Sequence, residues 1–296
     1  MNKKLSLYDT EPIFSRVRLK IKGNMAKWSV FAFCGIIFGA AMIQIGLTAI
    51  LKMVFGEKLD EMLVQLYSTA IEIIAVICYC KNAEKLPLRT MGIRKTKVLR
   101  DYLIGAVAGV GMFSAAVGIN CLFGKMENQD VVEGISWGII ALYVIGWLLQ
   151  GFSEEILCRG FLMTAMGVRS KPWSAVIGSS LIFAALHLGN DNVTALAFVN
   201  LTLFGIFAGV LFLRTDSIWM VAALHSLWNF AQGNLYGIEV SGMQISRKIL
   251  QFQATESGHW LNGGAFGIEG GLATTVLFTA GIVLMLFWKQ RDPAEK

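Results

Sequence analysis

Residues 136–166 read SWGIIALYVIGWLLQGFSEEILCRGFLMTAM, an apolar stretch that holds only three charged side chains, Glu154, Glu155 and Arg159. A helix needs about 20 apolar residues to cross a hydrocarbon core of about 30 Å. The stretch therefore predicts a membrane-spanning helix. If the helix begins at about Leu142, the two carboxylates lie near its midpoint. If it begins at the first residue quoted, they lie at its cytoplasmic boundary.

Seven further apolar runs flank this stretch. The chain has 296 residues, of which 55% are hydrophobic and 16% are charged. A soluble domain carries about a quarter charged residues. The other runs are 28–51, 62–80 (interrupted by Glu72), 102–124, 173–186, 193–213, 217–236 and 271–288. We therefore expect an all-α protein, a polytopic membrane helical bundle with about eight transmembrane helices.

The 26 Lys and Arg residues are distributed unevenly among the loops. If the runs thread a membrane alternately with the N-terminus inside, most loop cations fall on the inner side. The outer side holds only Lys52, Lys58, Lys125, Arg247 and Lys248. This asymmetry follows the positive-inside rule and predicts a multi-pass protein of the cell membrane with both termini in the cytoplasm. The net charge of +6 thus reflects contact with the lipid bilayer and does not indicate nucleic-acid binding.

Two loops stand out between the runs. Residues 81–100 are basic and predict either an amphipathic segment along the inner headgroups or a solvated loop. Residues 237–270 are polar and end in NGGAFGIEGG. Because glycine tolerates positive φ and close backbone approach, this segment is expected to fold back over the mouth of the bundle. A plain flexible loop is the alternative.

Ionisable groups inside the hydrocarbon cost about 2.5–3.5 kcal/mol each on insertion scales, so a functional role is the default hypothesis for them. In this chain most of them, with one amide, cluster in the second half. They are Glu154, Glu155, Arg159, His187, His225 and Asn229. Glu72 is a lone carboxylate in an earlier run, and nothing in the sequence connects it with this set.

Helical spacing separates the two carboxylates. Glu155 and Arg159 are four residues apart and can pair on one face of a helix. Glu154 is turned by about 100° from Glu155 and is left free of Arg159. The pattern predicts a neutralised, structural carboxylate and a second one aimed elsewhere.

The histidines follow the same spacing rule. Phe183 shares a helix face with His187, and His225 shares one with Asn229. With Glu154, these side chains can activate a water molecule and stabilise an oxyanion. In that scheme Glu154 is the general base, His187 positions the water, and His225 and Asn229 donate to the oxyanion. Intramembrane carboxylates and histidines also form proton paths, and a lone histidine can simply bond two helices, so these alternatives stay open.

Three short motifs strengthen the first interpretation. EEILCR (154–159) fits EExxxR, FAALH (183–187) fits FxxxH, and HSLWN (225–229) fits HxxxN. Together they resemble the CPBP family of intramembrane proteases, which includes type II CAAX prenyl endopeptidases and bacteriocin-processing or self-immunity (Abi) proteins. The resemblance covers roughly residues 136–236. It implies a protease-like core there, within a membrane domain of residues 28–296 that follows a cytoplasmic basic tail of residues 1–27.

The resemblance also implies roles for individual residues. Glu154 would activate water with His187, His225 and Asn229 would stabilise the oxyanion, and Glu155, Arg159 and Phe183 would support them. The family is often labelled metalloprotease, so Glu154, His187 and His225 are a possible site for a divalent metal such as zinc. Because the chain has no HExxH motif and Asn is a poor zinc ligand, a metal-free mechanism is preferred.

The sequence therefore predicts an intramembrane endopeptidase that hydrolyses a bond of a peptide or membrane-protein substrate. Two other functions remain possible for the same residues. One is a non-catalytic bacteriocin self-immunity or scaffold protein of the membrane. The other is a proton-coupled transporter.

Overall fold

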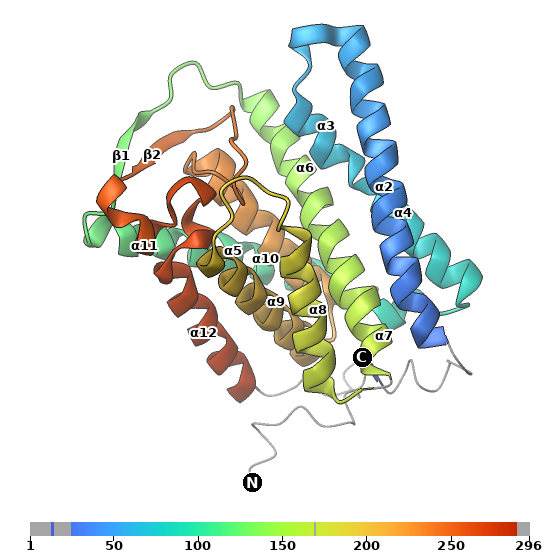
Figure 1. Cartoon of the computed structure of the whole chain (residues 1–296). Coiled ribbons are helices and arrows are strands. Elements are labelled where there is room, and N and C mark those ends of the chain that lie inside the picture. The colour runs from blue at the N-terminus through green and yellow to red at the C-terminus, as the bar shows by residue number, and fades with distance from the viewer. Residues whose placement is uncertain (1–12, 15–24, 169, 289–296) are drawn as a thin grey trace.

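The computed structural model describes residues 13–14, 25–168 and 170–288 of the chain (Figure 1). The predicted basic tail, residues 1–27, lies almost wholly outside the described residues. The predicted location of both termini in the cytoplasm concerns residues outside them as well.

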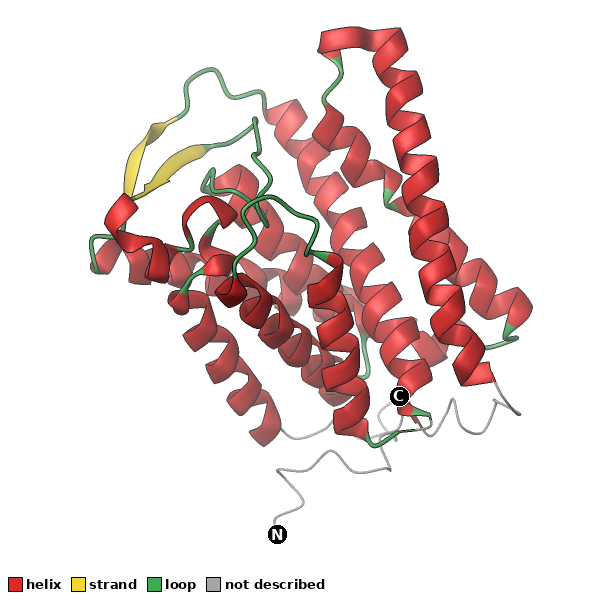
Figure 2. Cartoon of the chain, in the orientation of Figure 1, coloured by secondary structure: helices red, strands yellow, loops and turns green. Residues whose placement is uncertain are grey.

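Each of the eight apolar runs is helical, which confirms the predicted all-α bundle (Figure 2). The long helices, in chain order, are α2 (Met25–Phe55), α3 (Glu61–Ser68), α4 (Ala70–Cys78), α5 (Val98–Leu122), α6 (Trp137–Glu155), α8 (Pro172–Leu186), α9 (Ala195–Thr215), α10 (Ile218–Phe230) and α12 (Leu272–Phe287). Short helices α7 (Thr164–Gly167) and α11 (His259–Asn262) complete the set, with π-helical segments at Tyr79–Ala83, Ile156–Met163 and Ala231–Leu235.

The helices differ in their capacity to cross a membrane. Within the described residues, five helical segments are long and apolar enough to do so by length and composition. They are Ser29–Lys58, Glu61–Ala83, Val98–Leu122, Trp137–Gly167 and Ala195–Thr215. Helices α8 and α12 have 15 and 16 residues, and α10 continues into the π-helical segment Ala231–Leu235. Because a 15-residue helix is about 22 Å long, α8 and α12 are shorter than a hydrocarbon core of about 30 Å.

The stretch 136–166 forms one continuous helical span. α6 continues into the π-helical segment Ile156–Met163 and then into α7, and the whole span Trp137–Gly167 has 31 residues. Glu154 and Glu155 therefore lie just past its middle, as expected for a helix that runs through the carboxylates. A π-helical segment is wider than an α-helix and is frequent at functional sites.

Helix α10 lies at the centre of the bundle and packs against α5, α6 and α9 (Figure 1). Glycines permit its close approach to α5, because a Cβ added at Gly105 or Gly109 would collide with backbone carbonyl groups of α10. Nearly all side chains of α10 are consequently buried. The helix that carries His225 is thus fixed by its neighbours on several sides.

Gly205 and Gly209 on α9 permit close packing against α8. A Cβ at Gly205 would lie 2.6 Å from Cβ of Ser180 on α8, and one at Gly209 would lie 3.2 Å from Val176 on the same helix. The two glycines therefore bring α9 and α8 together, which fixes the position of the helix that carries His187.

The segment 237–270 is folded, as predicted in the first of its two alternatives. Its strand β2 (Leu250–Ala254) pairs antiparallel with β1 (Met126–Val131) in a two-stranded sheet that the sequence did not predict. Further along, Glu269 is buried and accepts hydrogen bonds from the backbone nitrogen and hydroxyl of Ser241 at 2.8 and 2.7 Å. Residues 237–270, called the cover segment below, are held by these bonds.

Part of the basic loop 81–100 is packed into the structure, which neither of its two predictions included. Arg94 is buried, and its guanidinium donates to the backbone oxygen of Thr215 at 3.2 Å. The indole of Trp219 donates to the backbone oxygen of Arg94 at 2.9 Å. The loop is therefore packed against the start of α10. Sequence could not foresee this, because both partners lie more than a hundred residues away.

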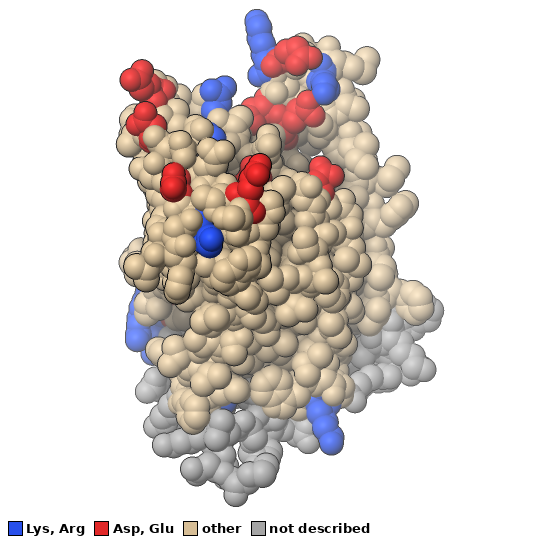
Figure 3. Space-filling model, turned by 60° about the vertical axis from the view of Figure 1, so that its left-hand side comes forward, with Lys and Arg blue, Asp and Glu red and all other residues tan. Residues whose placement is uncertain are grey.

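On the face of the bundle that Figure 3 draws, charged side chains avoid the middle. On the face drawn in Figure 3, Asp and Glu side chains gather toward one end, and a broad band of uncharged side chains lies below them. Large apolar side chains such as Phe38, Val107 and Leu284 are exposed. Such a band is what a membrane-embedded bundle presents to lipid.

Candidate active site

A cavity of about 280 Å³ lies inside the bundle. Its walls come from α2, α3, α4, α6, α8, α9, α10 and α12 and from the π-helical segment Ile156–Met163, with residues of the cover segment at one end. The four predicted catalytic residues, Glu154, His187, His225 and Asn229, all line it. The structure therefore brings to one place side chains that lie up to 75 positions apart in the sequence.

The contact between α6 and α10 sets the geometry of this site. Gly151 lies where the two helices cross, and a Cβ there would lie only 2.8 Å from the backbone nitrogen of Ser226. Because the helices approach so closely, Glu155 reaches His225, and its Oε1 lies 2.8 Å from Nδ1 of the ring. A larger residue at position 151 would separate the two helices that carry the site.

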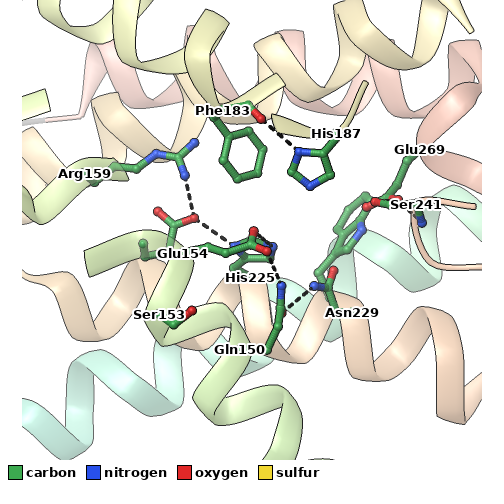
Figure 4. A network of polar contacts seen from close by, with 12 residues as sticks. Gln150, Ser153, Glu154, Arg159, Phe183, His187, His225, Asn229, Ser241 and Glu269 are labelled. Carbon is green, nitrogen blue, oxygen red and sulfur yellow. Dashed lines mark hydrogen bonds and ion pairs between the residues drawn. The ribbon is translucent and has the colours of Figure 1, made fainter. Parts of the chain in front are cut away.

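Glu154 projects into the cavity and is not paired with Arg159, as predicted. Its Oε1 accepts a hydrogen bond of 2.5 Å from Nε2 of Gln150. Its Oε2 has no hydrogen-bond partner among the described residues and lies 3.7 Å from Nε2 of His225 (Figure 4). One carboxylate oxygen is thus fixed, and the other faces an imidazole at a distance that exceeds a direct hydrogen bond.

Glu155 and Arg159 form the predicted ion pair, with Nη1 of Arg159 2.8 Å from Oε1 of Glu155. Both side chains are almost completely buried, and the guanidinium lies 4.5 Å from the ring centroid of Phe183 and 5.5 Å from that of Phe204. The view of Glu155 as purely structural was incomplete, because the same Oε1 also meets His225. Helical spacing could not reveal a partner on another helix.

His187 ends helix α8, and its Nδ1 lies 2.9 Å from the backbone oxygen of Phe183. A carbonyl only accepts, so Nδ1 carries the hydrogen in this contact and, in the neutral ring, Nε2 keeps its lone pair. The ring of Phe183 lies 4.8 Å from that of His187, as predicted for a pair on one helix face. His187 can therefore accept a hydrogen bond on the side of the ring turned away from Phe183.

Gln150 belongs to the site and was missed by the sequence analysis. Its amide nitrogen donates to Glu154, and its amide oxygen accepts from Nδ2 of Asn229 at 3.0 Å (Figure 4). It therefore connects the carboxylate on α6 with the amide on α10. The available signal was its position four residues before Glu154, where a side chain lies on the same helix face.

Glu72 also lies at the site, although the sequence analysis connected it with no other residue of the set. Its Oε2 accepts a hydrogen bond of 2.7 Å from the hydroxyl of Ser153, the residue before Glu154, and its Oε1 accepts one of 3.3 Å from Gln44. It lines the same cavity as Glu154. No pattern within one helix could have found this, because the three residues lie on α2, α4 and α6.

The possible metal site of Glu154, His187 and His225 is not assembled. Among the described residues, no three His, Cys, Asp or Glu side chains are placed so that they could hold a metal ion. Nδ1 of His225 is engaged by Glu155, whose carboxylate also binds a guanidinium. The residues as arranged do not fit a divalent ion, and no step below passes through one.

Comparison with known proteins fits this geometry. Residues 136–231 match the family described as type II CAAX prenyl endopeptidase Rce1-like. This segment belongs to the CPBP family of intramembrane proteases. The CPBP core thus spans α6 to the end of α10, about a third of the chain, and ends five residues before the boundary expected from the sequence motifs. No curated protein matches the chain.

The family match supports a general activity for the CPBP core. The core is that of a CAAX-type intramembrane endopeptidase, a peptidase whose substrate is a peptide or a membrane protein and whose surroundings are the lipid bilayer. Helices α2 to α5, α12 and the cover segment lie outside the matched residues, although α2, α3, α4, α12 and the cover segment supply part of the cavity wall.

Proposed function

We propose that the CPBP core hydrolyses a peptide bond with a water molecule that Glu154 activates. The observation that carries the proposal is the placement of Glu154 Oε2, which faces His225 across 3.7 Å inside a cavity and has no hydrogen-bond partner among the described residues. A carboxylate fixed through one oxygen and open at the other is suited to accept a proton from bound water.

In the first step, the water oxygen attacks the carbonyl carbon of the substrate and its proton passes to Glu154. His187 assists by accepting a hydrogen bond from the second hydrogen of the water at Nε2, since its Nδ1 is engaged with the backbone. The carbonyl oxygen becomes an oxyanion. The proton then passes from Glu154 to the leaving nitrogen, the C–N bond breaks, and the products are a carboxylic acid and an amine.

Two donors serve the oxyanion in this proposal. As an imidazolium, His225 donates Nδ1–H to Glu155 and has Nε2–H left for the substrate. Asn229 uses one amide hydrogen for Gln150 and keeps the other. Donors fixed in advance, in a site that excludes bulk water, stabilise developing charge without reorganisation.

Glu155 and Arg159 act through His225 in this scheme and are positioning residues. The carboxylate holds the ring in one tautomer and one orientation, and it stabilises the positive form. Arg159 in turn fixes the carboxylate, with its guanidinium between the rings of Phe183 and Phe204. Residues of all three motifs therefore help to hold the imidazole of His225 in one orientation.

The membrane orientation is part of the proposal. We infer a multi-pass protein with both termini in the cytoplasm, supported by the basic residues of the loop 81–100 and the acidic residues near β1, β2 and the α2–α3 connection. The cover segment then faces the outside. Cysteine labelling of intact cells tests this, with Ser257→Cys expected to react with an impermeant reagent and Lys95→Cys expected to stay unreacted.

The experiment for the catalytic proposal uses purified full-length protein in detergent and a membrane-peptide library. Glu154→Gln keeps the size of the side chain and removes the base, so cleavage should fall by about 10²- to 10⁴-fold. Glu133→Gln, an exposed carboxylate outside the cavity, is the control and should cleave like the parent. Full activity in Glu154→Gln would overturn the proposal.

Chelation tests the metal-free form of the proposal and the rival functions together. Cleavage should persist after thorough removal of divalent ions. Loss of cleavage that zinc restores would make the enzyme a metalloprotease. If the parent protein cleaves no peptide under any condition, the result favours a scaffold protein or a transporter. Proton flux in proteoliposomes then distinguishes these two, because only a proton-coupled transporter should show it.

A further inference from the structure

Glu269 is a buried carboxylate that lines the cavity. It lies between Ile268 and Gly270 in a short turn before α12, and only 9% of it is exposed. Both hydrogen bonds from Ser241 end on Oε2, and Oε1 has no hydrogen-bond partner among the described residues. The residue's backbone oxygen accepts a bond of 2.7 Å from Asn200. The carboxylate is therefore held firmly, with one oxygen available.

Among the described residues on the cavity wall, no Lys or Arg balances the charge of Glu269. The described residues that line the cavity include the carboxylates of Glu72, Glu154 and Glu269 but no Lys or Arg. The nearest guanidinium belonging to the site, Arg159, is buried behind the cavity and is bound to Glu155. Buried carboxylates are almost always paired, because the desolvation of an isolated charge is costly. This arrangement favours a cationic ligand.

The position of Glu269 suits a substrate contact at some distance from the bond that is cut. In Figure 4, His187 and Asn229 lie between Glu154 on one side and Glu269 with Ser241 on the other. All of these side chains line one cavity. A peptide whose carbonyl meets His225 and Asn229 can therefore place a nearby side chain or terminus against Glu269.

The geometry points to Glu269 as a specificity-determining residue that binds a cationic group of the substrate, an ammonium or guanidinium. The inference rests on the proposed function in taking a peptide as the ligand of the cavity. It implies that peptides with Lys or Arg close to the scissile bond are preferred. It also implies that an acidic side chain beside the scissile bond is disfavoured, because the described cavity wall carries Glu72, Glu154 and Glu269 but no Lys or Arg.

The test compares otherwise identical fluorogenic peptides that carry Lys, Gln or Glu at each position beside the scissile bond. N-terminal acetylation in one arm and a free amino group in the other separate a side-chain cation from a terminal one. The full-length protein should cleave the best Lys or free-amine peptide with a kcat/KM about tenfold above that of its neutral partner, with the Glu peptide slowest. Equal values for the three peptides would overturn the inference.

Glu269→Gln removes the charge and keeps an acceptor for Ser241. In this variant the ratio of kcat/KM between the cationic and the neutral peptide should fall to about one. Glu269→Asp keeps the charge and should retain a reduced preference, which guards against a variant that fails to fold. Glu256→Gln is the matched control, because Glu256 is an exposed carboxylate of the same cover segment and should leave the preference unchanged. Retention of the full preference in Glu269→Gln would contradict the inference.

Binding separates this inference from the proposed hydrolysis. The Glu154→Gln variant should bind the Lys peptide about tenfold more tightly than the Gln peptide, and Glu154→Gln/Glu269→Gln should not. If the parent cleaves nothing but this binding difference holds, the proposed chemistry fails and the cationic site stands. If cleavage occurs but binding is equal, the proposed function stands and the cationic site falls.

Discussion

Nδ1 of His225 lies 2.8 Å from Oε1 of Glu155, in a contact between two helices that is almost completely buried. The two residues are 70 positions apart in the chain. Because a carboxylate can only accept in this contact, the ring hydrogen is fixed on Nδ1, and Nε2 is directed toward the cavity. The second carboxylate of the EE motif thus orients the imidazole, while the first faces it across the cavity.

The first prediction concerns Glu155→Gln. The variant leaves a buried guanidinium without its counter-charge, which should lower the free energy of unfolding by about 3–5 kcal/mol. It also removes the charge that orients His225, so kcat should fall about a hundredfold or more with little change in KM. Thermal unfolding in detergent and peptide cleavage measure the two effects.

The double variant Glu155→Gln/Arg159→Met separates stability from catalysis. Replacing the unpaired guanidinium by an apolar side chain should recover most of the lost stability. The rate should stay low, because no carboxylate holds the ring. A double variant with both stability and rate restored would show that Glu155 has only a structural role.

The second prediction concerns Gln150, which links Glu154 with Asn229. Gln150→Leu removes both hydrogen bonds while keeping a similar volume, so kcat should fall about tenfold as the carboxylate and the amide lose their fixed positions. Leu149→Ala, on the same helix but outside the cavity lining, provides the comparison. Rates measured at saturating peptide decide the matter, and an unchanged kcat in Gln150→Leu would refute the linking role.

The third prediction compares two serines. Ser153→Ala takes from Glu72 its 2.7 Å hydrogen bond and leaves only the 3.3 Å contact with Gln44, so the free energy of unfolding should fall by about 1–3 kcal/mol. Ser179→Ala, equally buried, loses only a bond to the carbonyl of Val176 in its own helix and should change stability by less than about 1 kcal/mol. Similar losses in both variants would argue against a special contact between α4 and α6.

The fourth prediction compares two glycines on α5. Gly109→Ala places a Cβ against the backbone carbonyl of Leu224, the residue before His225, so α10 must shift and both stability and kcat should fall. Gly111→Ala has open space around it and should be neutral or stabilising by about 0.5–1 kcal/mol. Unfolding midpoints and cleavage rates of the pair provide the measurement, and equal behaviour would mean that the α5–α10 contact does not constrain the site.

Part of the site could be read directly from the sequence. Helical spacing correctly paired Glu155 with Arg159, placed Phe183 beside His187, and left Glu154 free of the arginine. These are contacts within one helix, where 3.6 residues per turn determine which side chains meet. The roles assigned to Glu154, His187, His225 and Asn229 stay a prediction for the experiments above.

Helical spacing could not predict the contacts between different helices. Glu72 had no visible partner because Ser153 lies 81 positions away on α6. Gln150 looked like one more residue of an apolar run until α10 brought Asn229 to it. The basic loop 81–100 was expected to lie at the surface, but the guanidinium of Arg94 donates to the backbone oxygen of Thr215. The three cases share one cause. In each, the packing of the helices brings together two residues that are far apart in the sequence.

A bundle of apolar helices with ionisable groups in its second half could be predicted from the amino-acid order, because hydropathy and helical period are local properties. Which of those groups share a cavity, and which lie behind it, depends on how the helices pack. The physical reason lies in the glycines at 105, 109 and 151, which let α10 approach α5 and α6 so closely that His225 meets Glu155 and faces Glu154. The cover segment then adds Glu269 to the same cavity, through hydrogen bonds to residues 200 and 241.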